Sequence, residues 1–110
     1  MTKKLLTAAF ILVCTSAVTA WAVDGKATWD DNCTKCHGAD GKGHTNMGRK
    51  LHIPDFSDAA VQAGFTDEKA AAAVKNGVTD KDGRMRMKAI EGLSDDDIKA
   101  VVQYLRSLKQ

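Results

Sequence analysis

The sequence predicts one small all-α domain, on three observations. The chain has 110 residues, enough for a single domain with a modest core. It contains no run of alternating β-branched residues long enough to indicate a sheet. Apolar residues near its C-terminus recur at helical spacing behind a strong N-cap. We therefore expect about three to five helices separated by loops.

The first 22 residues are typical of a secretory signal peptide. MTKK is a positive start, LLTAAFILVCTSAVTA is uncharged and mostly apolar, and Ala20-Trp21-Ala22 is a small-residue cleavage site. The predicted organisation is a signal peptide over 1–22 and a domain over 23–110. The alternative is a retained membrane anchor, because residues 5–22 are only slightly shorter than the roughly 20 apolar residues that span a bilayer.

The charge and the cysteine content limit the possible functions of the exported part. Removing the first 22 of the 110 residues would leave 88, with 14 basic and 14 acidic side chains. This balance argues against nucleic-acid binding, which needs a basic excess. Cys14 lies in the leader, so only Cys33 and Cys36 remain. A domain this small usually needs a disulfide, metal or other staple, and these two cysteines are the candidates.

The first helix is expected over 25–36, with Asp24 as its cap. A loop then runs from Gly38 to Pro54, because glycines interrupt regular structure and proline cannot lie inside a helix. A short helix is expected over 57–63. A clearer one lies in TDEKAAAAVKNG, residues 66–77, where Thr66 caps the start and Gly77 ends it.

The last helix has the strongest signals. Ser94 is its predicted cap, three aspartates in the first turn suit the positive end of the helix dipole, and Leu93 is placed to pack on Ile98 as a hydrophobic staple. One apolar stripe follows at helical spacing and consists of Ile98, Val101, Val102, Leu105 and Leu108.

The stretch CTKCH, residues 33–37, is the most specific motif. C-x-x-C-H is the attachment signature of a c-type haem. In that interpretation Cys33 and Cys36 form thioethers with the haem vinyl groups, and His37 binds the iron. A thioredoxin-like pair or an iron–sulfur cluster fits less well, since no strand precedes the motif and only two thiolates are present.

A zinc site is the other alternative for the two cysteines. It would combine them with His44 and His52. The spacing between these histidines is wider than in the usual finger, and a zinc site leaves His37 without a role. Haem attachment accounts for all three residues of the motif.

Three further segments surround this motif: Gly25 and Trp29 at G-x-x-x-aromatic spacing, CHGADGKG, and MKAIEGLSDDDIKAVVQYLRSL. With them, residues 24–110 resemble the small class I monohaem c-type cytochromes of bacteria. The resemblance implies a periplasmic protein with a cytochrome c fold wrapped around one covalently attached haem c. It also implies that the first helix crosses the last one near Tyr104 and Leu105.

The second axial position of the iron separates an electron carrier from a gas-binding or catalytic protein. The resemblance implies a methionine shortly before the last helix, since Met87-Lys88-Ala89-Ile90 is similar to the family's Met-Pro-Ala-Phe turn. Met87 is thus the expected ligand and Met85 the alternative. Lys88 replaces the proline of that turn, so we expect a more easily displaced bond. The other side chains weighed for this position are Met47, His44 and His52.

Two expectations concern the surroundings of the haem. The loop after Gly38 lacks the proline whose carbonyl commonly accepts the His37 proton in this family, so another carbonyl of that loop is expected to accept it. The apolar pocket is expected to include Trp29, Ile53, Phe56, Phe65, Ile90 and Leu105.

The predicted function is one-electron transfer, with no catalytic residue and no small-molecule substrate. The alternatives are a relay subunit of a periplasmic dehydrogenase or oxidase complex and, if the sixth position is open, a haem gas sensor. The predicted partners are redox proteins with acidic docking surfaces, and the protein is expected to be a monomer that contacts a membrane only if the leader is retained. The cations proposed for docking are Lys81, Arg84, Arg86 and Lys88 around the expected methionine ligand, with Lys35 and Lys42 flanking the attachment site, although simple solvation explains them equally well.

Overall fold

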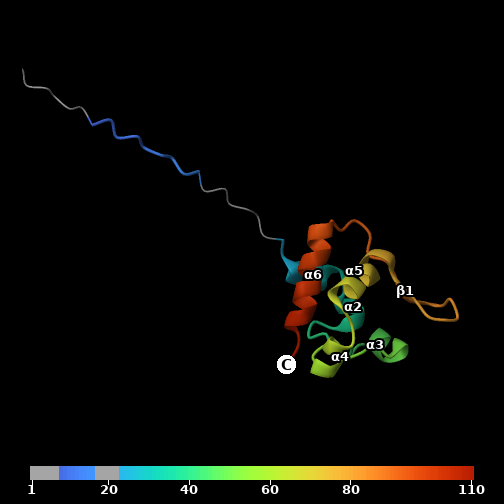
Figure 1. Ribbon diagram of the computed structural model, residues 1–110. Coiled ribbons are helices and arrows are strands. Elements are labelled where there is room, and N and C mark those ends of the chain that lie inside the picture. Colours follow the sequence, from blue (N-terminus) through green and yellow to red (C-terminus); the bar gives the residue numbers. More distant parts are fainter. Residues whose placement is uncertain (1–7, 17–22) are drawn as a thin grey trace, which may run out of the picture.

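The computed structural model describes residues 8–16 and 23–110. Within them the chain is predominantly helical, with one small hairpin (Figure 1). The elements in chain order are α1 Gly25–Asn32, α2 Thr34–His37, α3 Asn46–Leu51, α4 Ala59–Ala63, α5 Asp67–Asn76, β1 Val78–Thr79, β2 Met85–Met87 and α6 Asp95–Ser107. No helix in these two described segments has the length and apolar character needed to cross a membrane. The predicted leader lies largely outside the described residues, which omit 1–7 and 17–22.

Helix α6 is the central element, with α1 and α5 packed against it. Its start is as predicted, because the Ser94 hydroxyl accepts from the Asp97 N–H while the Asp97 carboxylate accepts from the Ser94 N–H. Helix α5 also begins and ends as expected, with Thr66 as N-cap and Gly77 as C-cap. The helix ends that the sequence predicts from local capping residues are therefore confirmed.

The crossing of α1 and α6 depends on Gly25. A Cβ placed on Gly25 would lie 2.2 Å from the Ala100 carbonyl oxygen and 3.2 Å from Tyr104 Cβ. One turn further along α1, the Trp29 ring lies 5.9 Å from the Tyr104 ring, measured between centroids. The predicted contact between the first and last helices is therefore confirmed.

Several expectations about the elements were wrong. The first helix does not run unbroken over 25–36: it ends at Asn32, and α2 is a separate turn. The loop before Pro54 contains α3, which Thr45 caps through the Gly48 N–H. A two-stranded antiparallel sheet is present, with Val78 opposite Met87. The described residues thus contain more helices than the three to five expected, and α4 begins at Ala59 rather than at residue 57.

The buried apolar core is small. It lies between α1, α5 and α6 and extends to the start of α2. Its members are Trp29, Cys33, Val74, Ile98, Val101 and Val102. None of the described side chains has less than 2% of its surface exposed. The core therefore consists largely of the inner surfaces of three helices.

Candidate functional site

An apolar cavity of about 190 Å³ lies among α1, α2, α5, α6 and the hairpin. It brings together three of the residues that the sequence singled out: Cys33, His37 and Met87. They come from the end of α1, from α2 and from β2. The remaining lining residues are Trp29, Phe56, Phe65, Lys69, Ala70, Ala73, Val74, Val101, Val102 and Leu105.

Local hydrogen bonds fix the C-x-x-C-H segment at this cavity. The Cys33 N–H donates to the Trp29 carbonyl at 2.8 Å, which continues α1 to its last turn. The Cys33 carbonyl in turn accepts from the N–H groups of Cys36 at 3.2 Å and His37 at 2.9 Å, and this closes the single turn of α2. Cys33 is buried, and Cys36 is half-buried on the same turn. The motif thus presents a thiol and an imidazole to one space.

The carbonyls of the last two motif residues, and of Gly38 after them, are already paired. The Thr45 hydroxyl donates to the Cys36 carbonyl at 2.6 Å, and the Gly43 N–H donates to the His37 carbonyl at 2.8 Å. The indole N–H of Trp29 donates to the Gly38 carbonyl at 3.0 Å. These contacts connect the turn of α2 to α1 and to the following loop.

The Nδ1 atom of the His37 imidazole does not have the expected hydrogen-bond partner. His37 Nδ1 is buried and forms no hydrogen bond within the described residues. A loop carbonyl was predicted to accept its proton, and in this structure that prediction is wrong. The physical reason is that the carbonyls nearest in sequence, those of residues 36–38, are turned toward other donors.

Burial keeps the His37 imidazole and the Cys33 thiol in their neutral forms. Desolvation lowers the pKa of His37, so the imidazole is uncharged at neutral pH and its nitrogen lone pair is free to bind a metal. Desolvation, followed by the proximity of Cys36, raises the pKa of the Cys33 thiol to about 11. The cavity therefore holds neutral donors in an apolar surrounding.

The two candidate methionines have different environments. Met87 is half-buried and lines the cavity, whereas Met85 is 62% exposed. The hairpin that carries them packs closely on the end of α5: a Cβ on Gly77 would lie 2.6 Å from the Met87 carbonyl oxygen. The Ile90 N–H also donates to the Val74 carbonyl at 2.8 Å. This packing turns Met87, and not Met85, toward the space that His37 lines.

The wall of the cavity was predicted in part. Trp29, Phe56, Phe65 and Leu105 line it as expected, but Ile53 and Ile90 do not. Sequence reasoning missed the contribution of α5, which supplies Lys69, Ala70, Ala73 and Val74. The four consecutive alanines at 70–73 predict a helix that packs closely, with no chemistry of its own, and their part in the wall of the cavity was not expected.

The other candidate ligands are not part of the cavity lining. Met47 is 40% exposed, and His44 and His52 are exposed in or beside the loop that contains α3. Within residues 8–16 and 23–110, no group of three or more His, Cys, Asp or Glu side chains is placed to hold a metal ion. The zinc set of two cysteines and two histidines is therefore not assembled.

The residues present fit a flat, apolar prosthetic group with a central metal ion. The helices offer apolar walls, His37 a neutral nitrogen, Met87 a thioether and Cys33 a thiol. The Cys36 thiol is half-buried on the same helical turn as Cys33 but is not part of the cavity lining. The buried, unpartnered His37 Nδ1 shows that the imidazole is not engaged in a protein hydrogen bond through that atom.

Comparison with known proteins agrees with this chemistry. A family model described as cytochrome c matches residues 22–109. The chain is 33% identical over 104 residues to the cbb3-type cytochrome c oxidase subunit FixP of Rhizobium meliloti (strain 1021), and equally so to that of Sinorhizobium medicae (strain WSM419). These matches cover 93% of this chain but 33% of either relative, so the chain spans about one third of the length of the curated relatives.

Solved structures show the same fold. The KustC0563 c-type cytochrome superposes with a TM-score of 0.68 at 29% identity, over 80% of this chain and 100% of that one. A point mutant of the same cytochrome gives a TM-score of 0.65 at 30% identity, over 79% of this chain and 100% of the mutant.

Proposed function

The chain belongs to the cytochrome c family, whose members carry covalently attached haem, and we propose that it is a periplasmic one-electron carrier. In this proposal Cys33 and Cys36 would form the thioether links to haem, and His37 and Met87 would bind its iron. The observation that carries it is the convergence of Cys33, His37 and Met87 on one apolar cavity. Export in this proposal depends on a signal peptide that is cleaved after Ala22. N-terminal sequencing of the mature protein tests this cleavage site.

Bound haem would supply the one-electron change between Fe(III) and Fe(II). The protein's own residues set the conditions for it. His37 is held neutral by burial and offers a nitrogen donor. Met87 offers an uncharged sulfur, and the surrounding aromatic and aliphatic side chains exclude water, so both favour the less charged ferrous form.

The proposed docking surface lies on the hairpin that carries Met87. Lys81, Arg84, Arg86 and Lys88 are all exposed there, and Figure 1 shows the hairpin projecting from the helical body beyond α5. Arg86 also donates to the Leu51 carbonyl at 2.5 Å, which connects the hairpin to the end of α3. A basic surface close to the haem would attract a redox partner with an acidic surface.

A second candidate function is supported by the FixP similarity. This chain matches those oxidase subunits over nearly its whole length, so the domain can also serve as a fixed electron relay within a larger complex. Purification under gentle conditions separates the two functions. A free carrier is recovered as a haem-containing monomer, whereas a relay subunit is recovered with its complex.

Absorption spectroscopy of the exported protein tests the axial ligands. The oxidised protein should show the weak band of a sulfur-to-iron transition, Met87→Ala should lose it, and Met85→Ala, the matched control, should keep it. Haem should stay attached during denaturing electrophoresis. A band that survives Met87→Ala would contradict the assignment of Met87. A wild-type protein without the band that binds carbon monoxide readily would instead be a gas-binding protein.

A further inference from the structure

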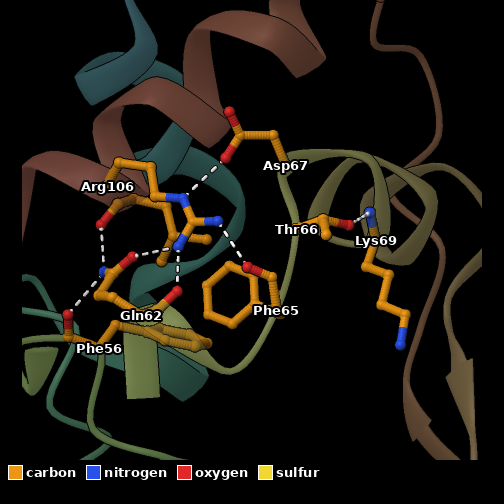
Figure 2. Close-up of polar contacts among 8 residues, drawn as sticks. Phe56, Gln62, Phe65, Thr66, Asp67, Lys69 and Arg106 are labelled. Carbon is orange, nitrogen blue, oxygen red and sulfur yellow. Dashed lines mark hydrogen bonds and ion pairs between the residues drawn. The ribbon is translucent and has the colours of Figure 1, made fainter. Parts of the chain in front are cut away.

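Arg106 of α6 makes an unusual number of contacts with a distant part of the chain (Figure 2). Its Nε donates to the Asp67 carboxylate at 2.7 Å, and Nη2 donates to the Phe65 carbonyl at 2.7 Å. Nη1 donates to the Gln62 side-chain oxygen at 2.9 Å and also to the Gln62 backbone carbonyl. One guanidinium therefore fixes both ends of the connection between α4 and α5.

Gln62 extends this attachment into the core. Its side chain is one of the few buried polar groups, with 5% of the residue exposed. Its amide nitrogen donates to the Phe56 carbonyl at 2.7 Å and to the Leu105 carbonyl at 2.9 Å. Arg106 thus satisfies the Gln62 and Phe65 carbonyls from the side of α6, and Gln62 in turn satisfies the Leu105 carbonyl of α6. These reciprocal bonds leave the connection little freedom to move away.

The same guanidinium stacks on an aromatic ring. Its central carbon lies 4.3 Å from the centroid of the Phe65 ring. The Phe65 ring meets the Phe56 ring edge to face at 5.8 Å, and the Phe56 ring lies 5.3 Å from the His37 ring. Both phenylalanines line the cavity. A continuous row of rings thus runs from Arg106 to the imidazole.

The ion pair with Asp67 is the least important of these contacts. The Asp67 side chain is 63% exposed, and an exposed pair is screened by water and contributes little. The Arg106 side chain is only 29% exposed, and most of its donors face carbonyl oxygens. Its shape and its fork of N–H groups are therefore more important here than its charge alone.

We infer that Arg106 is a positioning residue for the haem cavity: its guanidinium holds Phe65, and through it Phe56, against the space beside His37 and so keeps water out. The inference rests on the proposed function, since it assigns a role to the wall of the haem site. A loosened wall would hydrate the haem and favour the more charged ferric form, which lowers the reduction potential.

Three variants separate geometry from charge. Arg106→Lys keeps the charge but loses the fork of N–H groups and the flat stacking surface. Arg106→Gln loses the charge as well as this geometry. Lys99→Gln is the matched control, because it removes one exposed cation from the same helix. Reduction potentials are measured on the haem-loaded proteins, and hydrogen exchange of residues 62–67 is followed in parallel. Arg106→Lys and Arg106→Gln should both shift the reduction equilibrium several-fold toward the ferric form and speed exchange in 62–67, and Lys99→Gln should do neither.

The results also distinguish this inference from the proposed function. If Arg106→Lys kept the wild-type reduction potential while Arg106→Gln lowered it, the effect would be one of long-range charge, and the positioning role would be overturned. Unchanged potentials in both variants would also overturn it. Adding Arg106→Lys to Phe65→Leu should produce less than the sum of the single effects, and full additivity would also overturn it. If Arg106→Gln fails to fold, the lysine variant decides. A wild-type protein without haem would overturn the proposed function and this inference together.

Discussion

Trp29 connects the first helix to the haem-attachment turn through one hydrogen bond. Its indole N–H donates to the Gly38 carbonyl at 3.0 Å, and only 3% of the residue is exposed. Trp29→Phe keeps an aromatic ring but removes this donor, so the Gly38 carbonyl keeps only its bond from the Gly41 N–H at 3.2 Å. Loss of the hydrogen bond should lower the free energy of unfolding by about 0.5–1.5 kcal/mol, as measured by urea denaturation.

The control for this substitution is on the ring that faces Trp29. Tyr104→Phe removes a hydroxyl that forms no side-chain hydrogen bond within the described residues, so its stability should stay close to wild type. Equal losses in the two variants would mean that the bond to Gly38 does not determine the effect.

At the scale of single residues, the sequence predicted which side chains share one cavity better than it predicted their hydrogen-bond partners. Cys33, His37 and Met87 were expected at one site, and they line one cavity. The residue type determines which donor atom a side chain offers, so a motif in the sequence reveals the available donor atoms. The state of His37 Nδ1 depends on where loop carbonyls turn, and those directions are set by contacts such as Trp29 with Gly38.

At the scale of elements, the closest helix contact is the crossing of α1 and α6 at Gly25. Gly25→Ala would place a methyl group 2.2 Å from the Ala100 carbonyl oxygen, so one helix must shift. Overpacking of this kind costs about 1–3 kcal/mol, which thermal and urea unfolding would measure.

Gly64→Ala is the matched control for the crossing. Gly64 ends α4 with right-handed helical backbone angles, and a Cβ there would approach the Val61 carbonyl oxygen only to 3.3 Å. Its stability should change little. A loss as large as that of Gly25→Ala would show that the cost comes from glycine replacement in general and not from the helix crossing.

Elements with local signals were predicted, and elements that depend on distant contacts were not. Ser94 and Thr66 cap helices through their own neighbours, and both starts were expected. The hairpin of β1 and β2 depends instead on the close approach of Gly77 to Met87 and on the bond from Arg86 to Leu51. Helix α3 had a local signal in Thr45 that was overlooked behind the preceding glycines.

At the scale of the whole molecule, the charge distribution predicts how partners are found. The chain carries a net charge of only +2, yet the hairpin presents four exposed cations beside the proposed ligand. Reversing Lys81 and Lys88 to glutamate should slow electron exchange with an acidic redox protein, and the difference from wild type should shrink as salt rises. Stopped-flow measurements at several ionic strengths check this.

A charge-matched control lies away from the hairpin. Reversing Lys99 and Lys109, one on α6 and one just after it, changes the net charge by the same amount. That variant should exchange electrons nearly as fast as wild type. Equal slowing in both variants would mean that net charge, and not a docking surface, controls the rate.

The whole fold is also expected to depend on the bound haem. Five of the six buried core residues, all except Ile98, line the cavity. Without haem, the apolar side chains that line this cavity would face solvent, and each Å² of apolar surface left exposed costs roughly 25 cal/mol. A core of only six buried residues therefore depends on the bound group for much of its burial.

Removing the attachment sites tests this dependence. Cys33→Ser with Cys36→Ser should give a chain without covalent haem, with a lower midpoint of thermal unfolding and a broader transition than the haem-loaded protein. Wild-type chain produced without haem attachment is the control for the two substitutions, and it should unfold like the double variant. If either haem-free chain unfolded as sharply and at the same temperature as the loaded protein, α1, α5 and α6 would form a sufficient core by themselves, and the cavity would be a binding site added to an independently stable fold.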